Sequence, residues 1–581
     1  STPEKRSEDR PVVGDGIENS PDNHKDTPSE LSTVRFSLLA LGLCLGLFLS
    51  FIDSSIVATS LFSIGNEFND PEHVNWVAIA YTLAYMAFAV LFARISDVVG
   101  RRDAFIAAYI LFFAFSIGCG FAQDSMSRSS PSPSLVCLPP PSSFHTAKYT
   151  IGLYSLTMVI LMETSPDRFQ SHLGTIVGVV IAIGGVAGPV LGGILTHYAN
   201  WRWVFWINGP VGGVSMLLFC FTWPKAEFLP DLERKKWGEL DYTGSVLLIA
   251  AATLLVFPFQ NAGSAGNVWD KAIFLAPLLL GVGCWVALIA WTVFADRRWG
   301  DKLAAALPMR LMRDRVYTAT ILNTAFVGFL FIMLIYAFPL RVQVVNGKDA
   351  LMAGVMLLPL LGGCAVGSMV AGKFNSERNW ICETLVISNC LMVLGCGLLS
   401  TQSASADVEP KALGFLVLIG FGFGMTAASA TMLVGIRAAV QDSATAQGIL
   451  AQVRILGGSM GIAASSVILG RQIIGVVDPG QLAAIEHHPE NFPIEQLLAI
   501  RTAYSDAFNL DMRVCAIVGG IGIIFACAAW SRDRRPMAEV RKQNLEEEAQ
   551  RRGQRAWGRK TGQPSGTTLS SCIPVCYKKV I

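Results

Sequence analysis

One acidic residue stands alone in the first long uncharged stretch of the chain. Residues 36–65 hold no Lys, Arg or Glu, and Asp53 is their only Asp. A carboxyl group among apolar residues is desolvated, and desolvation favours its protonated form. If the stretch crosses a membrane, a charge there is costly and usually functional, so Asp53 is predicted to bind a proton or a substrate. A helix cap or a helix–helix hydrogen bond is the alternative.

A second isolated charge is Arg454, the only charged residue within 447–470. It lies about 10 Å from the start of this run if the run is helical. Arg454 is predicted to take part in proton coupling or substrate binding. The alternative is that its long side chain reaches back to the membrane surface.

Residues 93–102 place an acid and basic residues around a glycine, where an apolar run ends. Asp97 precedes Gly100, which allows a sharp reversal of the chain, and Arg101 and Arg102 follow directly. An acid at such an exit can pair with an Arg or face the N-terminus of a neighbouring helix. The alternative is an ordinary basic loop that contains an Asp by chance.

Residues 184–193 combine small residues with a proline. Small residues let helix backbones approach closely, and proline bends a helix. A generic packing face is the alternative to a role in conformational change. The positions expected to control helix contact are Gly184, Gly188, Pro189, Gly192 and Gly193.

The amino-acid composition indicates the class of protein that holds these residues. Of the 581 residues, 52% are hydrophobic and only 15% are charged, with a net charge of +2. These values argue against a cytosolic enzyme, a nucleic-acid binder and a disordered chain. They predict an all-α polytopic membrane protein, because a β-barrel would have much weaker hydropathy.

Fourteen apolar runs are long enough to be read as spans. Lys and Arg are more frequent in the alternate loops that would lie inside if the N-terminus is cytosolic, so both termini are predicted to be cytosolic. The predicted spans are 36–65, 76–93, 104–123, 149–162, 173–196, 203–223, 242–260, 272–295, 316–340, 350–372, 384–406, 412–436, 447–470 and 514–531.

Residues 125–148 do not fit this pattern. They are rich in Ser and Pro, and five prolines fall between 131 and 141. Proline removes a backbone donor and breaks a helix. The next run, 149–162, then rises only about 21 Å against a hydrocarbon core of about 30 Å. We interpret 125–148 as an aberrant insert, with a translated intron as the leading explanation.

The motifs together resemble those of the major facilitator superfamily. Residues 93–102 resemble its G-x-x-x-D-x-x-G-R-R signature, with Ala93 in place of the first Gly, and 188–193 resemble its G-P-x-x-G-G antiporter signature. Residues 52–58, 200–210 and 453–458 look like the fourteen-span drug:proton antiporter branch. Fungal efflux pumps are the most similar group. The family's span-4 Arg cannot be placed on any residue of this chain.

The resemblance implies a major facilitator fold, with two six-helix bundles, two inserted helices and a site between the bundles. The implied organisation is a disordered cytosolic tail at 1–35, an N-terminal bundle at 36–223 with its insert at 125–148, a two-helix linker at 224–300, a C-terminal bundle at 301–531 and a cytosolic tail at 532–581.

The resemblance also implies proton-driven export of small, largely apolar organic compounds such as drugs, toxins or secondary metabolites. Asp53 would take a proton from outside. No cofactor or metal is expected beyond the proton gradient, and the chain has no G-x-x-x-x-G-K-[ST] loop for ATP. The expected partners are the small substrate, protons and the lipid bilayer, with no nucleic acid, and the protein is expected to be a monomer in the plasma membrane.

Two alternatives remain open at this stage. The first is an importer or a vacuolar transporter, for instance of amino acids or siderophores, in which case the vacuolar membrane replaces the plasma membrane. The second is an inactive or receptor-like chain, because 125–148 disrupts the fourth span. Measuring the direction of flux in vesicles distinguishes an importer from an exporter. Testing whether expression of the chain confers resistance to a toxin distinguishes an active exporter from an inactive chain.

Overall fold

The computed structural model describes residues 32–68, 90–120, 153–473 with gaps, 494–531 and single positions up to 550. The longest gap within 153–473 is 225–235. The Ser/Pro-rich insert predicted at 125–148 lies outside the described residues, as do most of both predicted tails.

Every labelled element is a helix, as the sequence predicted. The N-terminal half contains α1 (Thr33–Phe68), α3 (Arg101–Gly120), α5 (Asp167–Tyr198), α6 (Trp203–Trp206) and α7 (Asn208–Thr222). The inserted pair is α8 (Tyr242–Ser264) and α9 (Ala272–Arg298). The C-terminal half contains α10 (Met309–Arg313), α11 (Arg315–Val344), α12 (Ala350–Val355), α13 (Leu358–Glu377), α14 (Ile381–Leu399), α15 (Pro410–Arg437), α16 (Ser443–Ile473) and α18 (Ile494–Ala528).

Among the described residues, 11 helices are long and apolar enough to cross a membrane. In lipid, backbone polar groups must be satisfied within the chain, and long helices meet this requirement. The protein is therefore an integral, multi-pass, all-α membrane protein. Three of the fourteen predicted spans are not among these 11 helices. The spans 76–93 and 149–162 fall partly on residues that are not described. The span 104–123 is largely covered by α3, but α3 is not one of the 11 helices.

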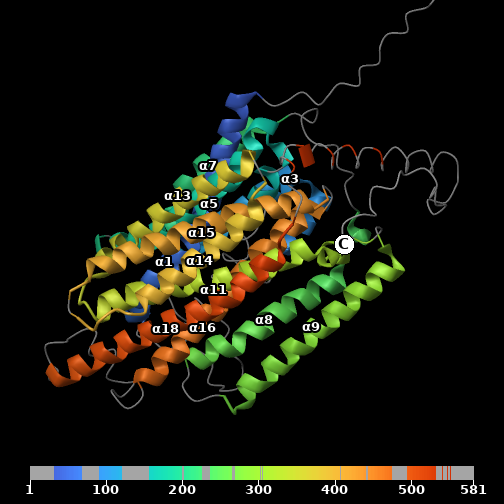
Figure 1. Cartoon of the computed structure of the whole chain (residues 1–581). Coiled ribbons are helices and arrows are strands. Elements are labelled where there is room, and N and C mark those ends of the chain that lie inside the picture. Colours follow the sequence, from blue (N-terminus) through green and yellow to red (C-terminus); the bar gives the residue numbers. More distant parts are fainter. Residues whose placement is uncertain are drawn as a thin grey trace, which may run out of the picture.

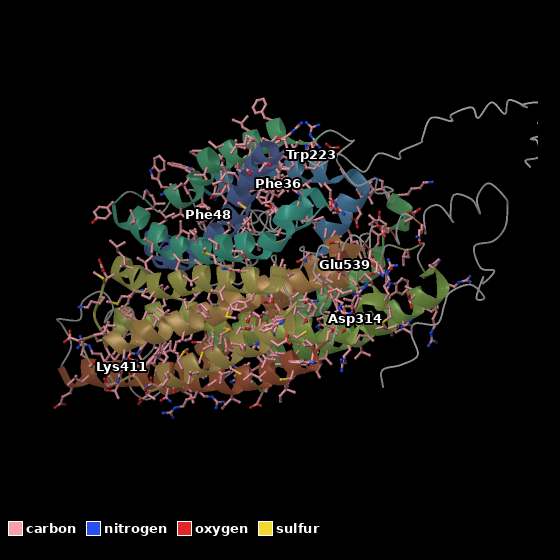
Figure 2. The ribbon with its side chains drawn as sticks, turned by 45° about the horizontal axis from the view of Figure 1, so that its top comes forward. Phe36, Phe48, Trp223, Asp314, Lys411 and Glu539 are labelled. Atoms are coloured by element: carbon pink, nitrogen blue, oxygen red, sulfur yellow. The ribbon has the colours of Figure 1, made fainter. Side chains whose placement is uncertain are left out.

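The helices form two groups (Figures 1 and 2). In the first group, α1 packs against α5 and α7. In the second group, α13 packs against α15, α11 against α16 and α18, and α14 against α15 and α18. The two groups meet where α5 contacts α12, α13 and α15. The inserted α8 and α9 pair with each other, and α8 packs on α16 at the side of the second group.

The last helix begins earlier than the hydropathy predicted. The run at 514–531 was expected, but α18 already begins at Ile494. Residues 494–513 are amphipathic: Ile500, Tyr504 and Phe508 are buried, whereas Asp506 and Arg513 are exposed. A search for uncharged runs misses such a segment, because the charges on its exposed face interrupt the run.

Glycines bring the backbones of α11 and α16 into contact. A Cβ atom built on Gly457 would lie 1.9 Å from the carbonyl oxygen of Ala325, and one on Gly328 would lie 2.1 Å from that of Arg454. Real Cβ atoms never approach a backbone oxygen so closely. Small residues at these positions therefore set the distance between the two helices.

We expect Gly457→Ala to destabilise the protein by about 1–3 kcal/mol, because the added methyl group would push α11 and α16 apart. Gly470→Ala is the matched control on the same helix, since nothing lies within 4 Å of its built Cβ. In the control, the better helix propensity of alanine should leave stability unchanged or raise it by up to about 1 kcal/mol. Thermal unfolding of the purified protein in detergent measures both, and equal effects would contradict close packing at Gly457.

Candidate functional site: a buried carboxylate and an inter-bundle ion network

Asp53 is completely buried on α1, beside the start of α7. It lies about 30 Å along α1 from Thr33, at the usual rise per residue. The Asn208 Nδ2 group of α7 donates hydrogen bonds to Asp53 Oδ1 and to Ser116 Oγ of α3, both at 3.0 Å. The Ser116 hydroxyl in turn donates to the carbonyl oxygen of Phe205 at 2.9 Å. Asp53 therefore belongs to a polar chain that joins α1, α3, α6 and α7.

This arrangement is suited to a carboxyl group that gains and loses a proton. An amide N–H donates to a carboxylate oxygen, and it can equally donate to the carbonyl oxygen of a protonated carboxyl group. The bond from Asn208 to Asp53 can thus persist in both protonation states. Sequence reasoning selected Asp53 but missed Asn208 and Ser116, because only the folded chain brings residues 155 positions apart into contact.

The second feature is an ion network around Asp97, at the end of the helical segment that precedes Gly100. Asp97 Oδ1 lies 2.6 Å from Arg101 Nη1, and Asp97 Oδ2 lies 3.4 Å from Arg94 Nη1. Gly100 has a φ of 107°, which is left-handed and favours glycine, so the chain can turn here into α3. Arg102 is exposed. The predicted motif is thus a compact turn closed by ion pairs.

Arg101 extends this network to the end of the fourth apolar run. Its Nη2 lies 3.0 Å from Glu163 Oε1, and its Nη1 donates to Ser96 Oγ at 2.5 Å. Burial alone would lower the pKa of Arg101, but the carboxylates of Glu163 and Asp97 raise it above its ordinary value. Glu163 was missed from the sequence, although it is the first acid after the run at 149–162.

Arg94 carries the network across to the other half of the molecule. Its Nη2 donates to the carbonyl oxygen of Ala305 and lies 3.8 Å from Asp442 Oδ1, just before α16. Asp442 Oδ2 also accepts from Arg310 Nε of α10 at 2.5 Å. We call the end of the molecule that carries these residues the ion-pair end. At this end the ion pair between Arg94 and Asp442 connects the two bundles.

The inserted helices support the same connection. Asp241, just before α8, is buried and accepts from Trp291 Nε1 of α9 at 2.9 Å and from the backbone nitrogen of Gly244 at 2.7 Å. It also accepts from the backbone nitrogen of Ala306 at 3.3 Å. The neighbouring residue, Ala305, is the one whose carbonyl receives Arg94. Asp241 therefore helps to fix an acceptor of the inter-bundle network.

The glycine-rich segment lies on α5, between the two bundles. A Cβ on Gly184 would lie 2.6 Å from Phe51 Cβ of α1, and Gly188 and Gly192 are buried as well. On α5 nearer the ion-pair end, a Cβ on Gly178 would lie 2.3 Å from Ser368 Oγ of α13. Thus α5 packs tightly on its own bundle and on the opposite one. The side chain of Pro189 and the surroundings of Gly193 are outside the described part of the structure.

Arg454 is buried on α16, about 17 Å along the helix from Ser443. Its Nη1 has no hydrogen-bond partner among the described residues. The described contacts of Asp53 and Arg454 do not join the two residues: Asp53 accepts from Asn208 of α7, whereas Arg454 packs at the contact of α16 with α11. Asn323 of α11 is fully buried, and neither of its amide atoms has a partner in the described part of the chain.

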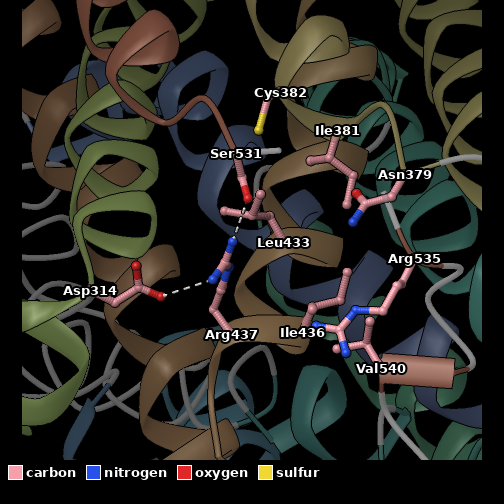
Figure 3. Close-up of a pocket in the computed structure, with 10 residues that line it drawn as sticks. All are labelled: Asp314, Asn379, Ile381, Cys382, Leu433, Ile436, Arg437, Ser531, Arg535 and Val540. Atoms are coloured by element: carbon pink, nitrogen blue, oxygen red, sulfur yellow. Dashed lines mark hydrogen bonds and ion pairs between the residues drawn. The ribbon is translucent and has the colours of Figure 1, made fainter. Parts of the chain in front are cut away.

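A polar pocket of about 210 Å³ opens at the ion-pair end of the C-terminal bundle (Figure 3). Arg437 Nη2 donates to Ser531 Oγ at 2.9 Å, and Arg437 Nη1 lies 3.8 Å from Asp314 Oδ2. These contacts hold the segment after α18 against the ends of α11 and α15.

No group of three or more His, Cys, Asp or Glu that could hold a metal ion occurs among the described residues.

We expect Asp442→Asn to weaken closure of the ion-pair end, because it removes the negative charge shared by Arg94 and Arg310. The reporter is a cysteine at Ser368, which is buried against Thr175 and Gly178 of the opposite bundle. Its labelling by a maleimide should become about tenfold faster, which corresponds to a shift of about 1.4 kcal/mol in the closed–open equilibrium.

Asp296→Asn is the control for this experiment. It removes an equally charged acid that pairs with Arg313 at 3.4 Å, on the same side of the molecule and without reaching the N-terminal bundle. Its labelling rate should match that of the parent protein. An Asp442→Asn rate equal to the control would show that the network does not hold the bundles together.

Comparison with known proteins identifies the family. Residues 43–462 match the family model of the Major Facilitator Superfamily. The MFS-type transporter FPY5 of Fusarium mangiferae is 30% identical over 497 residues, which cover 83% of this chain and 81% of the relative. The efflux pump roqT of Penicillium rubens is 26% identical over 516 residues, which cover 86% and 91% of the two chains.

Solved structures show the same fold. The proton:xylose symporter XylE aligns with a TM-score of 0.53 at 12% identity, covering 88% of this chain and all of XylE. The human organic anion transporter MFSD10 aligns with a TM-score of 0.52 at 14% identity, covering 83% and 99% of the two chains. The arrangement of helices, the family model and the relatives agree, and the chain belongs to the Major Facilitator Superfamily of membrane transporters.

Proposed function

We propose that this transporter is a proton-coupled exporter of small, largely apolar organic compounds. The observation that carries the proposal is the complete burial of Asp53 against Asn208, in an otherwise uncharged segment. A charge change in such a place alters the energy of the surrounding helices strongly, because little water screens it. The efflux pump names of relatives such as roqT support export as the direction.

In the proposed cycle, the two bundles rock around the α5 interface. The ion-pair end is joined by Arg94 and Asp442 in this structure, so a substrate would leave from the opposite end. Asp53 lies far from the ion network along α1, towards that opposite end, where it would receive an external proton. Proton binding would then favour opening of the ion-pair end, and export would follow from competition between proton and substrate for the two states.

The membrane and the topology follow from the same proposal. An exporter of toxic or metabolic compounds belongs in the plasma membrane, with the ion-pair end in the cytosol. This orientation agrees with the excess of Lys and Arg in the loops at that end. The fourteen-span count and the monomeric state belong to the proposal as well.

We expect Asp53→Asn to abolish gradient-driven export while the protein still folds, because asparagine keeps the shape and one acceptor but cannot titrate. Asp53→Glu should retain part of the activity. Asp103→Asn, an exposed acid on α3, is the matched control. The measurement is export of apolar fluorescent compounds from proteoliposomes with an imposed pH gradient, using compounds that the parent protein moves. Undiminished gradient-driven export by Asp53→Asn would exclude Asp53 from proton coupling.

A further inference from the structure

The C-terminal bundle buries a further aspartate, Asp511, which the family motifs do not include. Asp511 lies on α18, about 26 Å along the helix from Ala528. Only 2% of its surface is exposed. It faces α16, where Ser465 lies, and it belongs to the amphipathic part of α18 that hydropathy did not reveal.

The carboxyl group of Asp511 has an incomplete set of hydrogen bonds. Ser465 Oγ donates to Oδ2 at 2.5 Å, while Oδ1 has no partner among the described residues. An ionised carboxylate offers about four acceptor positions and is costly to bury unless they are filled. A protonated carboxyl group loses the charge and needs fewer donors. The single hydroxyl contact therefore suits the protonated form better than the ionised form.

Among the described residues, no cation pairs with Asp511. Tyr336 of α11 and Cys515 of α18 are electrostatic neighbours of Asp511, and Cys396 of α14 lies beside Cys515; all three are neutral in their ordinary state. The guanidinium of Arg341, also on α11, instead donates to the carbonyl oxygen of Ser403 and lies 5.3 Å from the Phe508 ring centre. The charged neighbours on α18, Asp506 and Arg513, are exposed.

Further unpartnered polar atoms lie between Asp511 and the end opposite the ion-pair end. Ser505 Oγ and Asn509 Oδ1, on the preceding turns of α18, have no partner in the described part of the structure. The same holds for both amide atoms of Gln402, whose backbone oxygen accepts from Asn509 Nδ2 at 2.8 Å. Buried polar atoms of this kind are usually satisfied by water. Water at these atoms would link Asp511 to that side of the membrane.

From this geometry we propose that Asp511 is a second proton-binding site, located in the C-terminal bundle and loaded from the end opposite the ion-pair end. A hydronium ion gives its proton to Oδ1 and leaves as water; this converts the carboxylate to a carboxylic acid, while the Ser465 contact to Oδ2 stays. Release reverses the step and returns the proton to water. The role of this site in transport rests on the proposed function, whereas proton binding itself does not.

Infrared difference spectroscopy of the full-length protein in lipid nanodiscs tests the site without a substrate. Titration of the parent protein should show the C=O absorption of buried carboxylic acids. Asp53 can contribute to this absorption as well, so the signal of Asp511 is the component that Asp511→Asn removes. Asp506→Asn, an exposed acid on the same helix, should keep it. Ser465→Ala should shift the frequency of the band without removing it, because one hydrogen bond to the carboxyl group is lost.

Two results would overturn the proposal. One is a titrating absorption that is the same in Asp511→Asn and in the parent protein. The other is the absence of any titrating C=O absorption from the parent protein over the pH range in which it stays folded, since no buried carboxyl group would then take up a proton. The proton site and the proposed function can fail separately. If the protein shows the Asp511 absorption but no gradient-driven export, the proton site is supported and the proposed function is wrong.

Discussion

The link between Arg94 and Asp442 is the interaction on which the closed form of this transporter depends. Both side chains are almost completely buried, and each also contacts a further charge in its own half. A buried charge that loses its partner is strongly destabilising. A partly opened ion-pair end, with the two charges separated but still buried, is therefore unfavourable, and the bundles should be either closed or fully open. The turn at Gly100 and the acceptor at Ala305 both serve to place Arg94.

Two buried aspartates outside this ion network, Asp53 and Asp511, have a different kind of hydrogen-bond partner. Asp53 and Asp511 are both buried, one in each bundle, and each accepts a hydrogen bond from a neutral group: Asp53 from the Asn208 amide and Asp511 from the Ser465 hydroxyl. Neutral donors stabilise a carboxyl group without fixing its charge, whereas an Arg partner would hold it ionised. In the proposed cycle, ion pairs at one end of the transporter act together with carboxyl groups elsewhere that gain and lose a proton.

The helical class, the long spans and the motif residues could be predicted from the sequence because hydropathy and glycine spacing are local properties. The position of Asp53 could be read from a single uncharged run. Its partner Asn208, and the pairing of Arg94 with Asp442, depend on how distant helices pack, and no local pattern reports that. Asp511 was missed for another reason: charges on the exposed face of α18 concealed a buried face at 494–513.

If protonation of Asp53 in the N-terminal bundle controls closure of the distant ion-pair end, the distance between the two halves at that end must change with pH. This pH dependence is tested most directly by electron–electron resonance distances between spin labels at the exposed positions Arg102 and Arg313, one in each half. We expect a longer-distance population that grows as the pH falls and is absent in Asp53→Asn. A distance distribution that does not change with pH in the parent protein, or changes equally in Asp53→Asn, would contradict it.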